Sequence, residues 1–201
     1  MHLYHSQYTR SGRARWILEE IGVAYDITRL ALRKGEHRTP EYLAISPHGS
    51  VPALVDGDLK LVESSAILLH LADKYPEARL APAPGTDARA EYYRWLVYVP
   101  ATVDPALEAI TRHTRILPEA QRNPVLAEEG RRRLAAILLV LEQAVDGRTY
   151  VVGDSFTAAD IAVASAIAWL GFIDLLADRP KLAAYLQPMQ QRPAYQRSVA
   201  D

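Results

Sequence analysis

The chain has 201 residues, 49% of them hydrophobic, and this length allows one large domain or two small ones. Its 23 basic and 24 acidic residues leave a formal net charge of −1, which argues against a nucleic-acid partner because domains that bind nucleic acids usually carry a basic excess. The absence of cysteine excludes a disulfide scaffold, a thiolate metal site and a cysteine nucleophile. We see no secretory signal or membrane-spanning run, so we expect a cytoplasmic protein with no membrane partner.

The first 75 residues alternate short apolar runs with helical patterns. The second helix is preceded by two apolar runs joined through Asp56-Gly57-Asp58, which indicates a hairpin because glycine tolerates the positive φ of such a turn. The pattern predicts strands over 2–5, 24–30, 52–55 and 59–62, and helices over 13–21, ending at Gly22, and 64–75.

The chain divides near residue 80. Tyr75-Pro76 ends the last of these helices, since a residue before proline disfavours the α conformation, and the proline-rich run that follows reads as a linker. Beyond it only helical patterns appear, over 86–112, 124–144, 157–176 and 181–190. We therefore predict an α/β domain over 1–78, a linker over 79–85, and an all-α domain over 86–201.

Four segments, in this order and spacing, resemble the cytosolic glutathione S-transferase family over nearly the whole chain. They are Leu3-Tyr4 followed by the hydroxyl-rich run 6–16, Ser46-Pro47-His48-Gly49-Ser50-Val51-Pro52-Ala53-Leu54, Glu63-Ser64-Ser65-Ala66-Ile67, and the run 153–162. The resemblance is to the bacterial kind of member, here with an active site that lacks cysteine. It implies a thioredoxin-like N-terminal domain, a helical C-terminal domain, glutathione as cosubstrate with no metal, and a homodimer.

The resemblance also implies where glutathione is held. It makes Val51-Pro52 a cis peptide bond, so that the backbone of Val51 pairs with the extended tripeptide as an added strand does. Ser64 can cap the following helix, whose N-terminus favours the γ-glutamyl carboxylate, and Glu63 can contact the ammonium group of the same unit. Lys34 and His37 are candidate counter-charges for the glycyl carboxylate. Without the resemblance, an ordinary trans proline and a simple cap are the favoured interpretations.

A hydroxyl group has to activate the thiol, because a free thiol with a pKa of about 8.5 is mostly protonated at neutral pH. We rank Ser11 first, since hydroxyl and helix N-terminus would act on one anion, then Thr9, then Tyr4 at the end of the first strand. Tyr8 and the cation of Arg10 remain further candidates. The competing interpretation is that Ser11 or Thr9 only caps the helix and Tyr4 only packs.

Thr157 and Asp160 form the outline of a capping box, which is a structural motif rather than a catalytic pair. The helical domain is expected to supply the pocket for the electrophile, from Tyr98, Arg112 and His113.

The resemblance predicts a transferase of the detoxification type, which activates the glutathione thiolate for attack on small hydrophobic electrophiles. The alternatives are a glutathione-dependent peroxidase, dehalogenase or isomerase on the same fold, or a relative that binds without turnover. The missing cysteine argues against chemistry that runs through a mixed disulfide between glutathione and the protein itself.

Overall fold

The computed structural model describes residues 1–200 and divides into two compact units. The first unit comprises Met1–Ala81 together with the segment that begins at Gln190, and the second comprises Pro82–Met189. The C-terminal segment therefore packs with the first unit, whereas the sequence pattern assigned everything after residue 86 to the helical domain.

The first unit is built on a four-stranded mixed sheet with the strand order β2-β1-β3-β4. The strands are β1 (His2–His5), β2 (Asp26–Arg29), β3 (Ala53–Asp56) and β4 (Leu59–Val62). Strand β2 runs parallel to β1, and the β3–β4 hairpin is antiparallel, with β3 antiparallel to β1. All four strands lie within a few residues of the positions that the apolar pattern predicts.

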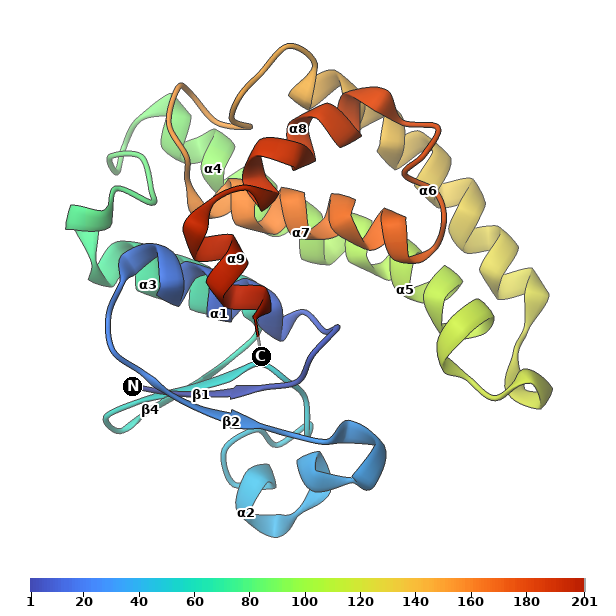
Figure 1. Ribbon diagram of the computed structural model, residues 1–201, viewed down its shortest axis with the longest axis horizontal. Helices are drawn as coiled ribbons and strands as arrows, with labels where there is room; N and C mark the ends of the chain where they lie inside the picture. Colours follow the sequence, from blue (N-terminus) through green and yellow to red (C-terminus); the bar gives the residue numbers. More distant parts are fainter. Residues whose placement is uncertain (201) are drawn as a thin grey trace. The chain divides into compact units, whose positions relative to one another are not determined.

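Helices cover both faces of this sheet, with α1 (Ser11–Ile21) and α3 (Ser64–Lys74) on one side and the short α2 (Pro40–Leu43) on the other (Figure 1). Because side chains alternate along a strand, Leu3 and His5 of β1 are buried on the α1 side, while Tyr4 lies against Tyr42 of α2. Helix α1 ends at Gly22, as predicted, in the left-handed conformation with a φ of 77°.

Three short 3-10 turns, η1 (Leu32–Lys34), η2 (Glu36–Arg38) and η3 (Pro76–Ala78), complete the connections of this unit. Neither these turns nor α2 was predicted, because segments of three or four residues are too short to show a helical period.

The last helix, α9 (Pro193–Val199), packs along α1. Arg192 makes a two-point ion pair with Glu20, at 2.6 and 2.8 Å, and the ring of Tyr195 meets Trp16 edge-on with the centroids 4.8 Å apart. These contacts explain why the end of the chain belongs to the first unit.

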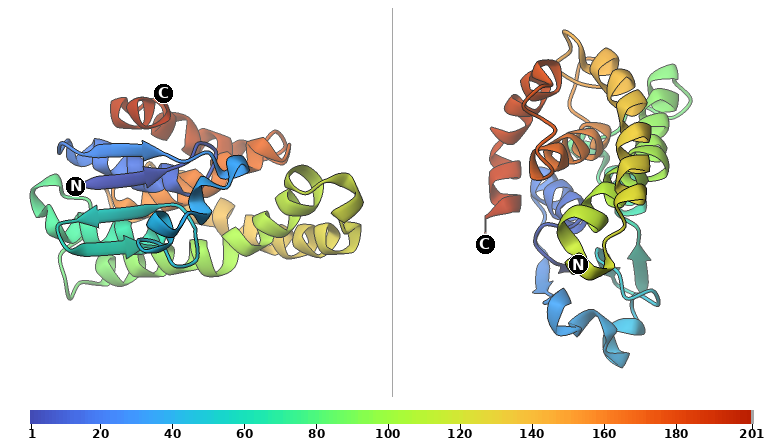
Figure 2. Two further views of the ribbon diagram at one scale, coloured as in Figure 1. Left: turned by 90° about the horizontal axis from the view of Figure 1, so that it is seen from below. Right: turned by 90° about the vertical axis from the view of Figure 1, so that its right-hand side faces the viewer.

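The second unit contains no strand among its described residues, in agreement with the sequence pattern. The short helix α5 lies along the long helix α6 (Figure 2). The elements are α4 (Asp87–Tyr98), η4 (Val99–Val103), α5 (Asp104–Thr111), η5 (Arg112–Ile116), η6 (Glu119–Gln121), α6 (Pro124–Val145), α7 (Ala158–Phe172) and α8 (Pro180–Gln190).

The predicted helix over 86–112 is interrupted between α4 and α5. The segment η4 is π-helical and contains Pro100, which has no backbone N–H to donate and therefore disturbs the regular ladder. A second π-helical segment, η5, follows α5.

A capping box starts α7, as predicted. The carboxylate of Asp160 accepts hydrogen bonds from the backbone N–H of Thr157 at 2.8 Å and from that of Val151 at 2.7 Å. Burial raises the pKa of Asp160 above its ordinary value even though these donors, and the hydroxyl of Tyr185, favour the ionised form. The motif therefore ties the preceding loop to a core helix.

Among residues 1–200, no helix is both long enough and apolar enough to cross a membrane.

Candidate functional site

The loop between β1 and α1 holds a compact set of hydroxyl groups. The Oγ of Ser11 lies 2.8 Å from Nδ1 of His5 and 2.6 Å from Oγ1 of Thr9. It also accepts from the backbone N–H of Ser6 and is placed to donate to the Ser6 carbonyl, both at 3.0 Å. Two of the three predicted thiol contacts are thus joined to each other.

These two hydroxyl groups differ in exposure. Ser11 is fully buried, with an exposed fraction of 0%, and is the first residue of α1, whereas Thr9 is half-buried in the loop. Tyr8, which directly precedes Thr9, is 81% exposed. It adopts a φ of 55°, a left-handed conformation that is unusual for a bulky residue.

Tyr4, the third predicted thiol contact, is not brought together with Ser11 and Thr9. Its ring lies 5.3 Å from that of Tyr42 and 4.7 Å from that of His2, on the face of the sheet that carries α2.

The loop before β3 is tightly held. The Val51–Pro52 peptide bond is cis, as expected. Burial raises the pKa of Tyr42 to about 12, so its hydroxyl stays protonated, and it donates to the carbonyl of Ser50 at 2.6 Å. The carbonyl of Ser50 also accepts from the Ser46 hydroxyl at 3.0 Å.

Gly49 brings this loop against the turn that carries His37. A Cβ atom at Gly49 would lie 2.6 Å from the carbonyl oxygen of His37, and the φ of Gly49 is 59°. Both facts require glycine here. The guanidinium of Arg38 also donates to the carbonyl of His48 at 3.0 Å.

The two predicted counter-charges lie in neighbouring 3-10 turns. Lys34 in η1 is exposed. His37 in η2 is half-buried, and its Nδ1 atom has no hydrogen-bond partner among the described residues. Such an atom has unused capacity for a polar ligand.

The β4–α3 junction differs in detail from the prediction. Ser64 is the first residue of α3 rather than its cap, and Glu63 occupies the cap position without a side-chain hydrogen bond. The helix thus begins one residue earlier than a Ser64 cap requires, and Glu63 at the cap position has a φ of 71°. The first N–H groups of α3 still have no partner within the helix, which favours an anion there.

The residues predicted to line an electrophile pocket lie along the second unit. Tyr98 ends α4, with its ring edge-on to Trp95 at 5.6 Å, and burial raises the pKa of its hydroxyl. Arg112 is exposed at the start of η5, and Nδ1 of His113 accepts from the backbone N–H of Asn123 at 3.2 Å.

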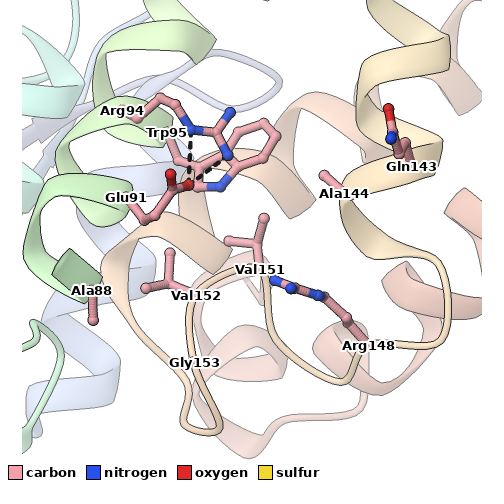
Figure 3. Close-up of a pocket in the computed structure, with 10 residues that line it drawn as sticks. All are labelled: Ala88, Glu91, Arg94, Trp95, Gln143, Ala144, Arg148, Val151, Val152 and Gly153. Atoms are coloured by element: carbon pink, nitrogen blue, oxygen red, sulfur yellow. Dashed lines mark hydrogen bonds and ion pairs between the residues drawn. The ribbon is translucent and has the colours of Figure 1, made fainter.

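A hollow of about 460 Å³ lies in the second unit between α4, the end of α6 and the loop before α7 (Figure 3). At its edge the guanidinium of Arg94 lies 4.2 Å from the centroid of Trp95 and pairs with Glu91 at 2.6 Å. Tyr98, Arg112 and His113 do not line this hollow.

Sequence reasoning did not consider His5 as part of the site. It is 3% exposed and occupies an inward position of β1, where an apolar side chain is the usual choice. This departure from the alternation after Leu3 is the signal that could have singled it out.

No group of three or more potential metal ligands occurs among residues 1–200.

The mixed sheet and the helices on its two faces define a thioredoxin-like domain, and a helical domain follows it. The family model for the glutathione S-transferase N-terminal domain matches residues 1–73, and that for the C-terminal domain matches residues 93–193. The chain therefore belongs to the glutathione S-transferase family, as the four motifs indicated.

Individual relatives agree with this assignment. Glutathione S-transferase F9 of Arabidopsis thaliana is 31% identical, over 98% of this chain and 95% of that protein. Glutathione S-transferase F10 of the same plant is 32% identical, over 96% and 93%. A glutathione transferase family member from Pseudomonas fluorescens, solved with two glutathione molecules bound, is 28% identical with a TM-score of 0.89, over 98% and 91%.

Proposed function

We propose that this enzyme binds glutathione on its first unit and uses the thiolate to attack small hydrophobic electrophiles. The observation that carries the proposal is the Val51 backbone just before β3, in the unit that also holds the N-terminus of α3, which has no side-chain cap. An extended tripeptide pairs with the first and presents a carboxylate to the second.

In the proposed complex each end of glutathione meets its own set of groups. The Val51 backbone pairs with the cysteinyl unit, next to the buried ring of Pro52. Ser64 and the α3 N-terminus hold the γ-glutamyl carboxylate, and Glu63 holds its ammonium group. Lys34, and His37 whose carbonyl meets Gly49, hold the glycyl carboxylate.

The chemical step needs one hydroxyl near the sulfur, and Ser11, Thr9 and Tyr4 are the candidates. A donated hydrogen bond and the N-terminus of α1 both stabilise the thiolate and lower the pKa of the thiol. The thiol proton leaves to water. The sulfur lone pair then forms a bond to carbon, and in a chloronitrobenzene the chloride departs with its bonding electrons.

The second unit is proposed to receive the electrophile near Tyr98, Arg112 and His113. A cytoplasmic location, a role in detoxification and a homodimeric state are part of the same proposal.

Titration calorimetry with glutathione is the first test, and we expect saturable binding. Conjugation of a chloronitrobenzene is then compared with reduction of an organic hydroperoxide. No binding at millimolar glutathione contradicts the proposal, and faster hydroperoxide reduction assigns the site to a glutathione peroxidase.

A further inference from the structure

The hydrogen-bonding capacity of Ser11 is used up inside the protein. A hydroxyl has one proton and two lone pairs, and four groups lie within 3.0 Å of the Ser11 oxygen. Because Ser11 is also fully buried, a sulfur atom could reach it only after the loop had opened.

Thr9 has the capacity that Ser11 lacks. Its oxygen accepts from the backbone N–H of Ser11 at 3.2 Å and lies 2.7 Å from the carbonyl of Ser6. The same carbonyl can accept the proton of Ser11 at 3.0 Å. The Thr9 proton can therefore turn to an incoming anion while the Ser6 carbonyl keeps a donor. Thr9 is half-buried, so this change needs no opening of the loop.

His5 decides which way these protons point. If Nδ1 of His5 carries a proton, it and the Ser6 N–H fill both lone pairs of the Ser11 oxygen, and Ser11 cannot accept from Thr9. If Nδ1 is bare, Ser11 donates to it and accepts from Thr9, which draws the Thr9 proton inward. The Nδ1–H form of this buried ring therefore prevents the Thr9 proton from turning to Ser11, whereas the bare form draws it there.

We propose that Thr9 donates the hydrogen bond to the glutathione thiolate, and that His5 is a positioning residue that turns the Thr9 proton outward through Ser11. This rests on the proposed binding of glutathione in the first unit. The left-handed backbone at Tyr8, one residue before Thr9, supports it, because such strain in bulky residues concentrates at ligand sites.

The test measures the pKa of the thiol of bound glutathione from the ultraviolet absorbance of its thiolate. The variants are Thr9→Val, its matched control Thr9→Ser, His5→Phe, its conservative counterpart His5→Asn, and the double variant Thr9→Val/His5→Phe. Calorimetry gives the dissociation constant of glutathione for each.

We expect Thr9→Val to raise the bound thiol pKa by about one unit, which is tenfold less thiolate below that pKa, with little change in glutathione affinity. Thr9→Ser restores the parent value. His5→Phe raises the pKa in the parent but adds nothing in the Thr9→Val background, because its effect passes through Thr9. His5→Asn, whose amide can donate to Ser11, recovers most of the parent value.

Three results overturn the proposal. One is an unchanged thiol pKa in Thr9→Val. Another is additive shifts from His5→Phe and Thr9→Val, which makes His5 merely structural. The third is a shift in Tyr4→Phe in place of Thr9→Val, which assigns the sulfur to Tyr4. If His5→Phe fails to fold, His5→Leu, which likewise cannot donate to Ser11, decides the same question in the two Thr9 backgrounds. Failure of the parent to bind glutathione contradicts the proposed function itself.

Discussion

At the scale of single residues, a substitution at Ser64 distinguishes a role in binding glutathione from a role in stabilising the fold. Its side chain makes no hydrogen bond to any described residue, although it is only 6% exposed at the first position of α3. A hydroxyl without a partner at a helix N-terminus contributes little to folding and has its capacity available for an anion.

We therefore expect Ser64→Ala to weaken glutathione binding about tenfold while the melting temperature stays close to that of the parent. The reason is that a hydrogen bond to a charged group contributes about 1.5–3 kcal/mol, and 1.4 kcal/mol corresponds to a factor of ten. Calorimetry and thermal denaturation measure the two quantities.

The neighbouring Ser65 provides a matched control. Its hydroxyl also lacks a partner, and it is buried one residue further along the helix. Ser65→Ala should leave glutathione affinity within error of the parent. Equal weakening by both variants would argue that the helix N-terminus, and not the Ser64 side chain, holds the carboxylate.

At the scale of elements, the attachment of α9 to α1 depends on ion pairs that include Glu19. Arg197 donates to its carboxylate at 2.7 Å, as does the hydroxyl of Tyr25. Burial tends to raise the pKa of Glu19, but these two donors outweigh it and hold the pKa below its ordinary value of 4.5. A depressed carboxylate pKa stabilises the fold above the ordinary value, and this stability is lost as the pH falls through the folded-state pKa.

Arg197→Met should lower the free energy of unfolding at neutral pH by about 0.2–1 kcal/mol, the range for partly exposed pairs. The difference from the parent should shrink below pH 4.5, as Glu19 becomes protonated. Denaturant titrations at several pH values measure this. Arg148→Met serves as control, because Arg148 is exposed and pairs with no carboxylate among residues 1–200. A difference that does not change with pH would show that Arg197 acts by packing alone.

At the scale of the whole molecule, the proposed homodimer needs an interface, and α4 carries two exposed apolar side chains. Tyr93 and Val97 are four residues apart, so they share one face of the helix, and they are 44% and 60% exposed. We expect this pair to take part in the proposed interface, because contiguous exposed apolar surface marks sites of protein–protein contact.

A homodimer predicts a mass of about twice 22.4 kDa in size-exclusion chromatography with light scattering. Val97→Asp should shift the protein toward the monomer, because a charge in an apolar interface loses its hydration. Leu139→Asp, at a residue 64% exposed on α6, is the control and should leave the mass unchanged. A parent protein that elutes at the monomer mass contradicts the dimer.

Much of the architecture follows from local signals. Tyr75-Pro76 ends a helix, because the residue before a proline disfavours the α conformation. Gly57 permits a tight turn, and Thr157 with Asp160 starts a helix within four residues. Because such signals act over a few residues, the sequence alone predicted the strands and the division near residue 80. The cis proline loop was predicted through the resemblance to the family.

Only the tertiary structure decided the rest, because it depends on partners distant in sequence. The return of α9 to the first unit requires Arg192 to meet Glu20, a pairing of residues 172 positions apart. The burial of Ser11 depends on β1 placing His5 beneath the start of α1, so a hydroxyl that looks ideal in the sequence is enclosed in the fold. The sequence thus determined which chemical groups the loop carries, and the packing determined which of them a ligand can reach.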